Sequence, residues 1–199
     1  MLSQLVAEWI WFIGGVLWFV IRYPHQRRSR KTKVARSAGG RRDQWLLMSS
    51  LTGLAIIPLI YFILGFFVTG PRFADYPFSP VQGWIGLALM LAALGLLYET
   101  HRQLGRNWSV TLDTRKKHTL IDTGLYAFVR HPMYSAFWLL AFAQAALLAN
   151  WIAGLAGIVG WGILFFLRVG KEEQLMVETF GDDYRAYMKR TKRVVPLIY

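Results

Sequence analysis

Long stretches without a charged side chain constrain the fold of this chain more than any other feature of its sequence. Residues 45–69, 81–98 and 133–167 carry no Asp, Glu, Lys or Arg, and residues 5–21 carry only Glu8. A helix needs about 20 residues to cross a hydrocarbon core of about 30 Å, so the last run is long enough for two helices. We therefore predict a single membrane domain, residues 1–199, with five transmembrane helices at about 5–21, 45–69, 81–98, 134–149 and 151–167.

Basic residues are kept apart from these apolar runs, and their distribution predicts the orientation in the membrane. The segment from Arg22 to Arg42 contains nine of the 23 Lys and Arg residues, whereas Arg72 is alone between residues 70 and 80. With five spans, the basic segments that follow the first, third and fifth spans lie on one side of the membrane, and the connections poor in Lys and Arg lie on the other. The positive-inside rule then predicts an N-terminus outside and a C-terminus in the cytoplasm. The sequence before residue 5 lacks a basic lead, so 5–21 is predicted to be a retained span.

Composition also excludes several kinds of function. A chain without cysteine has no disulfide, cysteine nucleophile or thiolate metal site. The four histidines are scattered without metal-ligand spacing, so no metal is expected. The run RRSRKTK has the composition of a nucleic-acid patch, but beside a membrane span such a run more often contacts anionic lipid headgroups. We expect anionic lipids along Arg22–Arg42 and no nucleic acid.

The predicted fold class is all-α: a polytopic integral membrane protein with a tight C-terminal helical hairpin. Pro58 interrupts the second span, where neighbouring helices can tolerate a kink. Small residues four positions apart let helices approach closely in lipid. Such residues occur on both predicted helices of the hairpin: Ala141, Ala145 and Ala149, then the pairs Ala153/Gly157 and Ala156/Gly160.

The residues after Leu167 are predicted to form cytoplasmic cap helices over the membrane face. Apolar residues at 175, 176 and 180 are spaced as on an amphipathic helix, and Gly181 is placed to end it. A second short helix is predicted around Tyr184 and Tyr187 and is closed by Pro196. The many aromatic residues of this segment favour an ordered structure.

Polar residues that are candidates for chemistry cluster at the predicted cytoplasmic ends of the last two spans. In the motif RHPMY, residues 130–134, the proline holds the backbone of His131 extended. Arg168 and Glu172 lie four residues apart and share a helix face, with Glu173 beside them. Ionisable residues at membrane depth are functional candidates. The alternatives are lipid-headgroup contact for the first motif and a weak surface ion pair for the second.

Two further features are weaker on their own. The motif LGRNWS, residues 104–109, contains a tryptophan typical of a membrane interface, and Tyr184 and Tyr187 are typical of packing. No glycine-rich nucleotide motif and no alternation of strands and helices is present. Any cofactor must therefore be held by the hairpin and the cap.

The order of these motifs resembles the isoprenylcysteine carboxyl methyltransferase family. LGRNWS is followed by HTLIDTGLYAFVRHPMY, the hairpin, the EE pair and FGDDYRAYMKRTKRVVP. The resemblance is good over residues 99–199, which it implies to be the catalytic part, and weak through the first two spans. It is greatest to the short prokaryotic members with five spans, which implies a prokaryotic inner membrane.

The resemblance implies methyl transfer from S-adenosylmethionine to the carboxylate of a lipophilic, prenylcysteine-like acceptor that enters from the bilayer. An ionised carboxylate needs no general base, only positioning and exclusion of water. By motif, the implied catalytic residues are Arg168, near the acceptor carboxylate, and Glu172. The implied cofactor contacts are His131, Pro132, Tyr134, Glu173 and Arg130.

Other activities stay open on the same scaffold. Relatives in this superfamily methylate small thiols or phospholipid amines, and others reduce sterols with a nicotinamide cofactor. A non-catalytic membrane accessory protein with this fold is a further alternative. Gly170, between Arg168 and the EE pair, departs from the family's pattern. A flexible residue at this position could change the direction in which the Arg168 side chain points.

Overall fold

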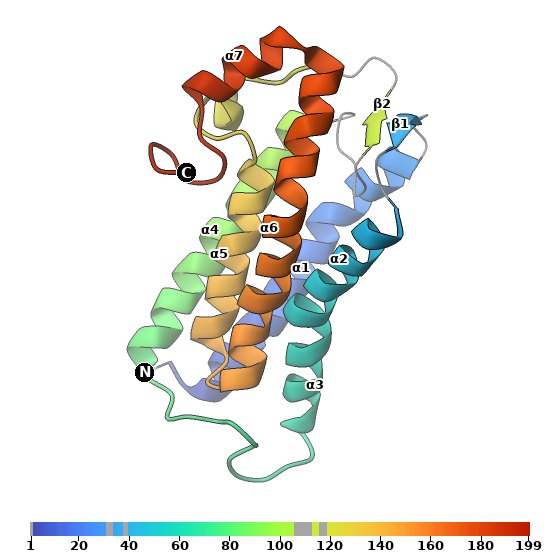
Figure 1. Cartoon of the computed structure of the whole chain (residues 1–199). Coiled ribbons are helices and arrows are strands. Elements are labelled where there is room, and N and C mark those ends of the chain that lie inside the picture. The colour runs from blue at the N-terminus through green and yellow to red at the C-terminus, as the bar shows by residue number, and fades with distance from the viewer. Residues whose placement is uncertain (1, 31–33, 38–39, 106–112, 116–118) are drawn as a thin grey trace.

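The structure is a computed structural model that describes residues 2–30, 34–37, 40–105, 113–115 and 119–199. In these residues the chain forms a bundle of long helices (Figure 1). The N-terminus and the C-terminus of the chain lie toward opposite ends of this bundle. Four helical segments are long and apolar enough to cross a membrane: Gln4–Arg28, Arg41–Leu64, Pro80–Leu104 and Trp151–Phe180. A fifth apolar helix, Pro132–Leu147, is shorter. The chain is a multi-pass integral membrane protein, and the all-α prediction is confirmed.

The helices follow the order of the predicted spans but differ from them in length. The helix α1 (Gln4–Arg30) and the helix α6 (Trp151–Phe180) both run well past the predicted ends at residues 21 and 167. Apolar composition marks only the part of a helix inside the hydrocarbon, whereas backbone hydrogen bonds continue beyond it. Between them lie α4 (Pro80–Leu104), the short 3₁₀ helix η3 (Gly124–Ala127) and α5 (Pro132–Leu147).

The second predicted span is one rod made of three segments: α2 (Arg41–Leu51), the π-helical turn η1 (Thr52–Ile56) and α3 (Ile57–Leu64). Pro58 lacks a backbone N–H, and its ring clashes with a carbonyl four residues earlier in a regular α-helix. The wider π turn ends at Ile56, two residues before this proline, so the predicted interruption is confirmed as a change of helix type. The rod ends at Leu64, before the predicted end at residue 69.

The C-terminal hairpin of α5 and α6 turns at Asn150. The Asn150 side chain accepts hydrogen bonds from the backbone N–H groups of Ile152 and Ala153, which caps the first turn of α6. At Gly154 a Cβ atom would lie 2.8 Å from the carbonyl oxygen of Leu148. The end of α5 and the start of α6 are therefore in close contact at the turn.

The small residues further along α6 serve a different neighbour from the predicted one. A Cβ at Gly160 would lie 2.4 Å from the carbonyl oxygen of Ser49, and one at Gly53 would lie 2.1 Å from the carbonyl oxygen of Ala156. The pair Ala156/Gly160 therefore lets α6 cross α2 and η1. Spacing of small residues predicts a close helix contact, but it does not say which helix is the partner.

The cap is present, and its first predicted helix is a continuation of α6. The helix runs unbroken to Phe180 and ends at Gly181, whose φ of 59° favours glycine. The second cap helix, α7 (Asp182–Arg190), lies across the end of the bundle in Figure 1. It ends at Arg190 and not at Pro196, because the chain then turns back toward α5.

A small sheet lies at the same end of the bundle, in segments that the sequence analysis left without structure. The strand β1 (Val34–Ser37) pairs with β2 (Asp113–Arg115) in antiparallel orientation. Two connecting segments at one membrane face can satisfy each other's backbone groups in this way.

At the opposite end, the lone acid of the first span meets the lone arginine of the connection 70–80. The Arg72 guanidinium donates to the Glu8 carboxylate and lies 3.7 Å from the centre of the Tyr61 ring. Asp75 accepts from the backbone N–H of Arg72 at 2.7 Å and from the Asn150 side chain at 2.9 Å. This polar cluster ties α1, α3 and the hairpin turn together away from the cap.

Candidate functional site

A cavity of about 730 Å³ lies between the helices on the side of the cap. Its apolar part is lined by residues such as Trp11, Phe12, Leu54, Leu59 and Met90, which come from α1, η1, α3 and α4. Its polar part is lined by the following residues from the RHPMY motif, α6 and the cap: Arg130, His131, Tyr134, Arg168, Glu172, Tyr184 and Tyr187. The cavity is therefore amphiphilic, with polar groups at the end near the cap.

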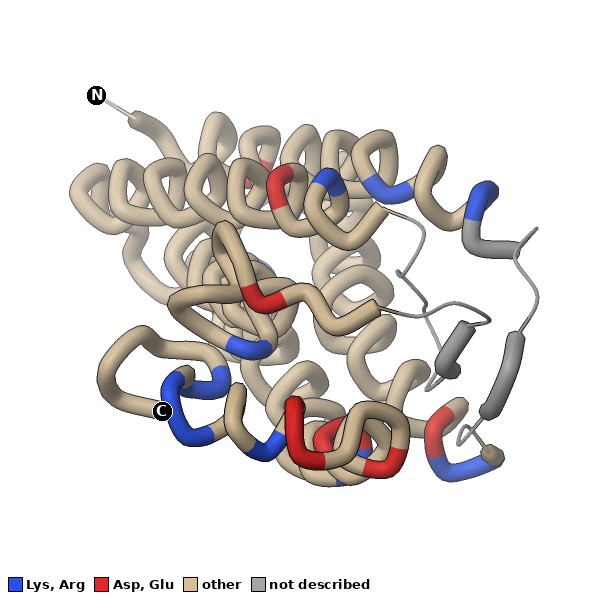
Figure 2. The backbone as a smooth tube through the Cα atoms, turned by 90° about the horizontal axis from the view of Figure 1, so that it is seen from above, with Lys and Arg blue, Asp and Glu red and all other residues tan. Residues whose placement is uncertain are grey.

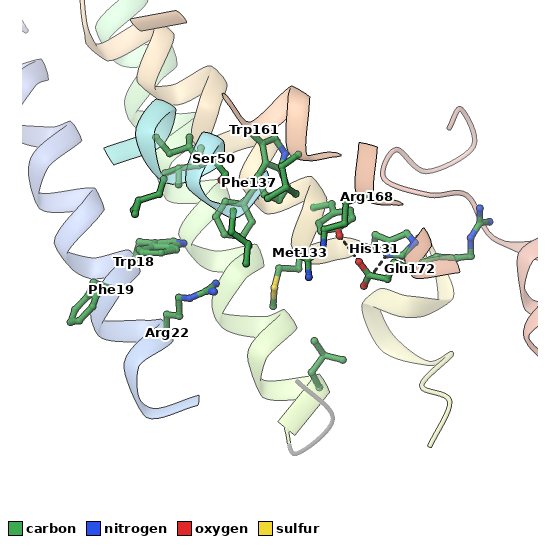
Figure 3. A pocket seen from close by; sticks show the side chains of 18 of the residues that line it. Trp18, Phe19, Arg22, Ser50, His131, Met133, Phe137, Trp161, Arg168 and Glu172 are labelled. Atoms are coloured by element: carbon green, nitrogen blue, oxygen red, sulfur yellow. Dashed lines mark hydrogen bonds and ion pairs between the residues drawn. The ribbon is translucent and has the colours of Figure 1, made fainter. Parts of the chain in front are cut away.

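The RHPMY motif positions His131 and Tyr134 in this polar part. His131 has a φ of −126° and a ψ of 62°, and Pro132 begins α5. The proline keeps His131 out of the helical region, but its backbone is not in the extended conformation that was predicted. The His131 ring stacks on the Tyr134 ring, with 5.2 Å between centres and 16° between planes. Tyr134 donates a hydrogen bond from its hydroxyl to Glu172. Figure 3 shows Glu172 pointing toward His131, and their nearest N and O atoms are 3.9 Å apart.

The two neighbouring glutamates point in different directions. Successive residues of an α-helix are rotated by about 100°, so only one of the pair can face the cavity. Glu172 lines the cavity, whereas the carboxylate of Glu173 is 5% exposed and turned toward the cap. Arg193 donates to Glu173 through Nε at 3.0 Å and Nη2 at 2.8 Å, and Arg130 donates to it through Nε at 2.9 Å.

Arg130 fastens the cap to the start of α5. Besides Glu173, its guanidinium donates to the backbone carbonyls of Met188, at 3.2 Å, and Thr191. The Arg130 side chain is only 8% exposed and forms a buried ion pair with Glu173. It therefore does not reach out to lipid headgroups. Next to it, the backbone N–H groups of Arg130 and His131 donate to carbonyls of the chain after α7, at residues 192 and 193. Figure 2 looks down on this end and shows charged residues of both signs around the C-terminal segment.

Arg168 lies inside the protein and has a partner that the sequence analysis missed. Its Nε atom is 3.4 Å from a carboxylate oxygen of Asp43, at the start of α2, and both side chains are less than 8% exposed. The signal for Asp43 was an acidic residue between a basic segment and an apolar span. Arg168 also lines the cavity, so this buried charge pair faces the polar part of the site.

Aromatic side chains from α1, α5 and α6 form one wall of the cavity. Phe137 stacks on Trp161 with 4.3 Å between ring centres, and Trp18 meets the edge of Phe137 at 5.9 Å. Figure 3 shows Trp18 and Arg22 projecting from α1 toward the side chains of α5. No catalytic or cofactor-binding residue was predicted in the first helix from the sequence.

The cap contributes buried tyrosines that stay neutral. Tyr187 donates a hydrogen bond to the carbonyl oxygen of Tyr126 at 2.6 Å. Burial raises the pKa of Tyr187 to about 12, and burial also raises the pKa of Tyr184. The two phenols are therefore hydrogen-bonding groups and not charges at physiological pH.

Not every predicted site residue lines the cavity. Pro132 is buried at the first turn of α5 and Glu173 belongs to the cap contact, so neither reaches the cavity wall. In LGRNWS, Leu104 lines the cavity, while residues 106–109 lie outside the described residues. Within the described part of the chain, no three His, Asp or Glu side chains gather as a metal site requires.

The fold and the cavity define a multi-pass membrane protein with an amphiphilic site under a polar cap. Residues 84–178 match the family model described as the isoprenylcysteine carboxyl methyltransferase (ICMT) family. Over these residues the chain is similar to this family. The predicted resemblance is confirmed, and the match extends from α4 through most of α6.

Individual relatives are named protein-S-isoprenylcysteine O-methyltransferase. The chain is 37% identical over 99 residues to the protein-S-isoprenylcysteine O-methyltransferase of Schizosaccharomyces pombe, in an alignment that covers 48% of this chain and 42% of that protein. It is 30% identical over 96 residues to the Homo sapiens protein of that name, with 47% and 34% covered. The chain therefore spans less than half the length of these two relatives.

A solved structure supports the fold beyond the matched segment. The chain is similar to the eukaryotic intramembrane Ras methyltransferase ICMT with a TM-score of 0.52 and 20% identity. The superposition covers 81% of this chain and 55% of that protein. This likeness therefore includes helices from the first half of the chain, where the sequence resemblance was weak.

Proposed function

We propose that this protein is an S-adenosylmethionine-dependent carboxyl O-methyltransferase that acts on a lipophilic, prenylcysteine-like acid at the membrane surface. The observation that carries the proposal is the shape of the cavity. One space joins a polar part under the cap, where a water-soluble cofactor fits, to an apolar part among the spans, where a lipid chain fits. The match of residues 84–178 to the ICMT family model supports the same reaction.

The residues of the polar part fit the cofactor by charge and shape. S-adenosylmethionine, when bound, supplies an electrophilic methyl group on a positively charged sulfur. The carboxylate of Glu172 is suited to hold the cofactor's ammonium group or ribose hydroxyls, and Tyr134 fixes that carboxylate by its hydrogen bond. His131 and the neutral phenols of Tyr184 and Tyr187 add hydrogen-bonding groups around it.

Arg130, Pro132 and Glu173 support cofactor binding in a different way. Glu173 and Arg130 join α6, the RHPMY motif and the chain after α7 through buried ion pairs. Pro132 sets the direction in which the chain enters α5. We propose that these residues position His131 and Tyr134, whereas the predicted direct contact of Glu173 with the cofactor passes to Glu172.

The reaction needs positioning and a dry site more than acid–base chemistry. A carboxylate is ionised at neutral pH and is itself the nucleophile. Arg168 orients this carboxylate through its planar donor fork, and Asp43 fixes the aim of the arginine. The aromatic wall of Trp18, Phe137 and Trp161 excludes water, which strengthens these electrostatic contacts.

The same proposal covers the arrangement in the membrane. Residues 99–199 form the catalytic part of one membrane domain, 1–199, and the cap faces the cytoplasm of a prokaryotic inner membrane. The acceptor enters sideways from the bilayer, and exposed basic residues between Arg22 and Arg42 rest on anionic lipids. The distribution of Lys and Arg supports this orientation.

Calorimetric titration with S-adenosylhomocysteine, in purified protein in detergent, tests cofactor binding. We expect saturable binding, and we expect Glu172→Gln to weaken it by about tenfold or more. This is the loss of affinity expected when one charge-assisted hydrogen bond is removed. The matched control is Glu178→Gln, an exposed glutamate on the same helix outside the cavity, which leaves binding unchanged. Folded protein that binds no S-adenosylhomocysteine would overturn the proposal and favour the reductase-like or accessory alternatives.

A second measurement separates the carboxyl methyltransferase from the thiol or amine methyltransferase. Methyl transfer to N-acetyl-S-farnesylcysteine is measured in Arg168→Gln, with binding of S-adenosylhomocysteine as the check on folding. We expect turnover to fall by about a hundredfold or more, because an acceptor carboxylate loses its orienting group. Turnover that persists on a thiol or phospholipid amine would instead support the alternative acceptors.

A further inference from the structure

A second arginine, from α1, faces the same cavity as Arg168. Trp11, Gly15, Trp18 and Arg22 follow one another at intervals of four, three and four residues, so they lie on one stripe of the helix. All four line the cavity. The guanidinium of Arg22 lies 5.1 Å from the centre of the Trp18 ring, and Figure 3 shows it projecting toward Met133.

This position distinguishes Arg22 from the other basic residues of α1. Arg27 and Arg28 are exposed, as expected for residues that contact lipid headgroups, whereas Arg22 is only partly exposed. An arginine side chain in a protein carries a positive charge. Arg22 is the first residue of the segment for which lipid contact was predicted, but in the structure it lines the cavity and brings a positive charge to the cavity wall.

Two guanidinium groups facing one cavity favour an anion between them. Arg22 and Arg168 both line the cavity, and the aromatic wall beside them keeps the local dielectric low. Arg168 is held beside Asp43, and Arg22 brings a second guanidinium to the cavity from the α1 side. A carboxylate bound here is attracted by both arginines.

Within the proposed function, we infer that Arg22 binds the carboxylate of the lipophilic acceptor together with Arg168 and so selects acids over neutral lipids. The stripe that carries Arg22 continues through Trp18 and Gly15 to Trp11, in the apolar part of the cavity. An acceptor with its chain along this stripe places its headgroup at Arg22. The cofactor end, at Tyr184 and Tyr187, belongs to the cap.

The test compares N-acetyl-S-farnesylcysteine with its carboxamide, which has the same chain and no charge. Binding of each to the purified protein is measured without cofactor, so the result does not depend on methyl transfer. We expect the acid to bind at least about tenfold more tightly than the amide. Arg22→Gln should weaken acid binding by about ten- to a hundredfold and change amide binding by less than about threefold.

Three controls make the result specific. Arg22→Lys retains the charge and should restore part of the preference for the acid. Arg102→Gln removes an exposed charge on α4 at the same end of the bundle and should change nothing. Binding of S-adenosylhomocysteine to Arg22→Gln should stay within about threefold of the unmodified protein, which also shows that the variant is folded.

Several outcomes would overturn the inference. A preference for the acid that persists in Arg22→Gln places the carboxylate elsewhere. Equal loss of acid and amide binding gives Arg22 a packing role only. Loss of S-adenosylhomocysteine binding with unchanged acid binding assigns Arg22 to the carboxylate of the cofactor. Failure of the proposed methyl transfer is a separate result, because it leaves the acid-to-amide ratio measurable.

Discussion

Arg168 and Asp43 show how a buried charge can be kept in a membrane protein. Each side chain is less than 8% exposed, and each supplies the counter-charge of the other across α2 and α6. A buried ion pair contributes little net stability, but removing one partner leaves an unpaired charge. The pair is therefore well suited to hold a guanidinium at a defined place in the cavity.

A double-mutant cycle tests this coupling. Asp43→Asn and Arg168→Gln should each destabilise the protein by about 3 kcal/mol, and the double variant should cost clearly less than the sum. Unfolding in detergent, followed by intrinsic fluorescence, gives the three free energies. Asp43→Asn should also lower turnover while leaving S-adenosylhomocysteine binding intact. Additive effects of the two substitutions would show that the side chains act independently.

The sequence predicted several residues that line the cavity, but not the residues from other helices that lie beside them. The RHPMY motif and the EE pair, with Arg168, were found because they are contiguous or one helical turn apart. Asp43 and Arg22 were missed because their role depends on how α1 and α2 pack against α6, which no local pattern contains. The different directions of Glu172 and Glu173 likewise depend on the rotation of α6 about its axis.

Helices in this protein are packed through a few glycines whose neighbours are backbone atoms. The crossing of α6 over α2 and η1 leaves no room for a side chain at Gly53 or Gly160. The sequence predicted close packing there from the spacing of small residues, and it predicted five apolar helices from hydropathy. It placed the helix ends and the partner of Gly160 wrongly, because hydropathy follows the membrane and not the hydrogen bonds.

Substitution at this crossing has a matched control on the same helix. Gly160→Ala puts a Cβ 2.4 Å from the carbonyl oxygen of Ser49, so α2 must move away and the protein should lose about 1–3 kcal/mol of stability. Gly170→Ala meets no atom within 4 Å and should be neutral or slightly stabilising, since alanine favours a helix. Thermal unfolding in detergent compares them. Equal stability of the two variants would mean that the crossing is loose.

The whole molecule separates two polar ends by an apolar bundle. The cluster of Glu8, Arg72 and Asp75 closes the end near the N-terminus, and the cavity with its cap occupies the other. The distribution of Lys and Arg predicts that the cap end is cytoplasmic, and the three-dimensional arrangement is compatible with either orientation. Orientation in the membrane is set during insertion by flanking charges and not by packing.

The absence of cysteine makes the orientation directly measurable, because one introduced thiol is the only thiol. Ser3→Cys lies near the N-terminus, and Asp183→Cys lies on the exposed surface of α7. In intact bacterial cells, a membrane-impermeant maleimide should label Ser3→Cys at once and Asp183→Cys only after permeabilisation. The reverse pattern would invert the proposed topology and put the cofactor end outside the cell.

The pairing of residues 129–131 with 192–193 has a consequence for biosynthesis. The backbone N–H groups of Arg130 and His131 find their carbonyl partners about sixty residues later in the chain, beyond α6 and α7. A ribosome releases the chain in order, so α5 and α6 enter the membrane while this edge of the site is still unpaired. The nascent chain therefore enters the membrane with this edge of the cavity unpaired, and the contact forms only after residues 192 and 193 have been translated.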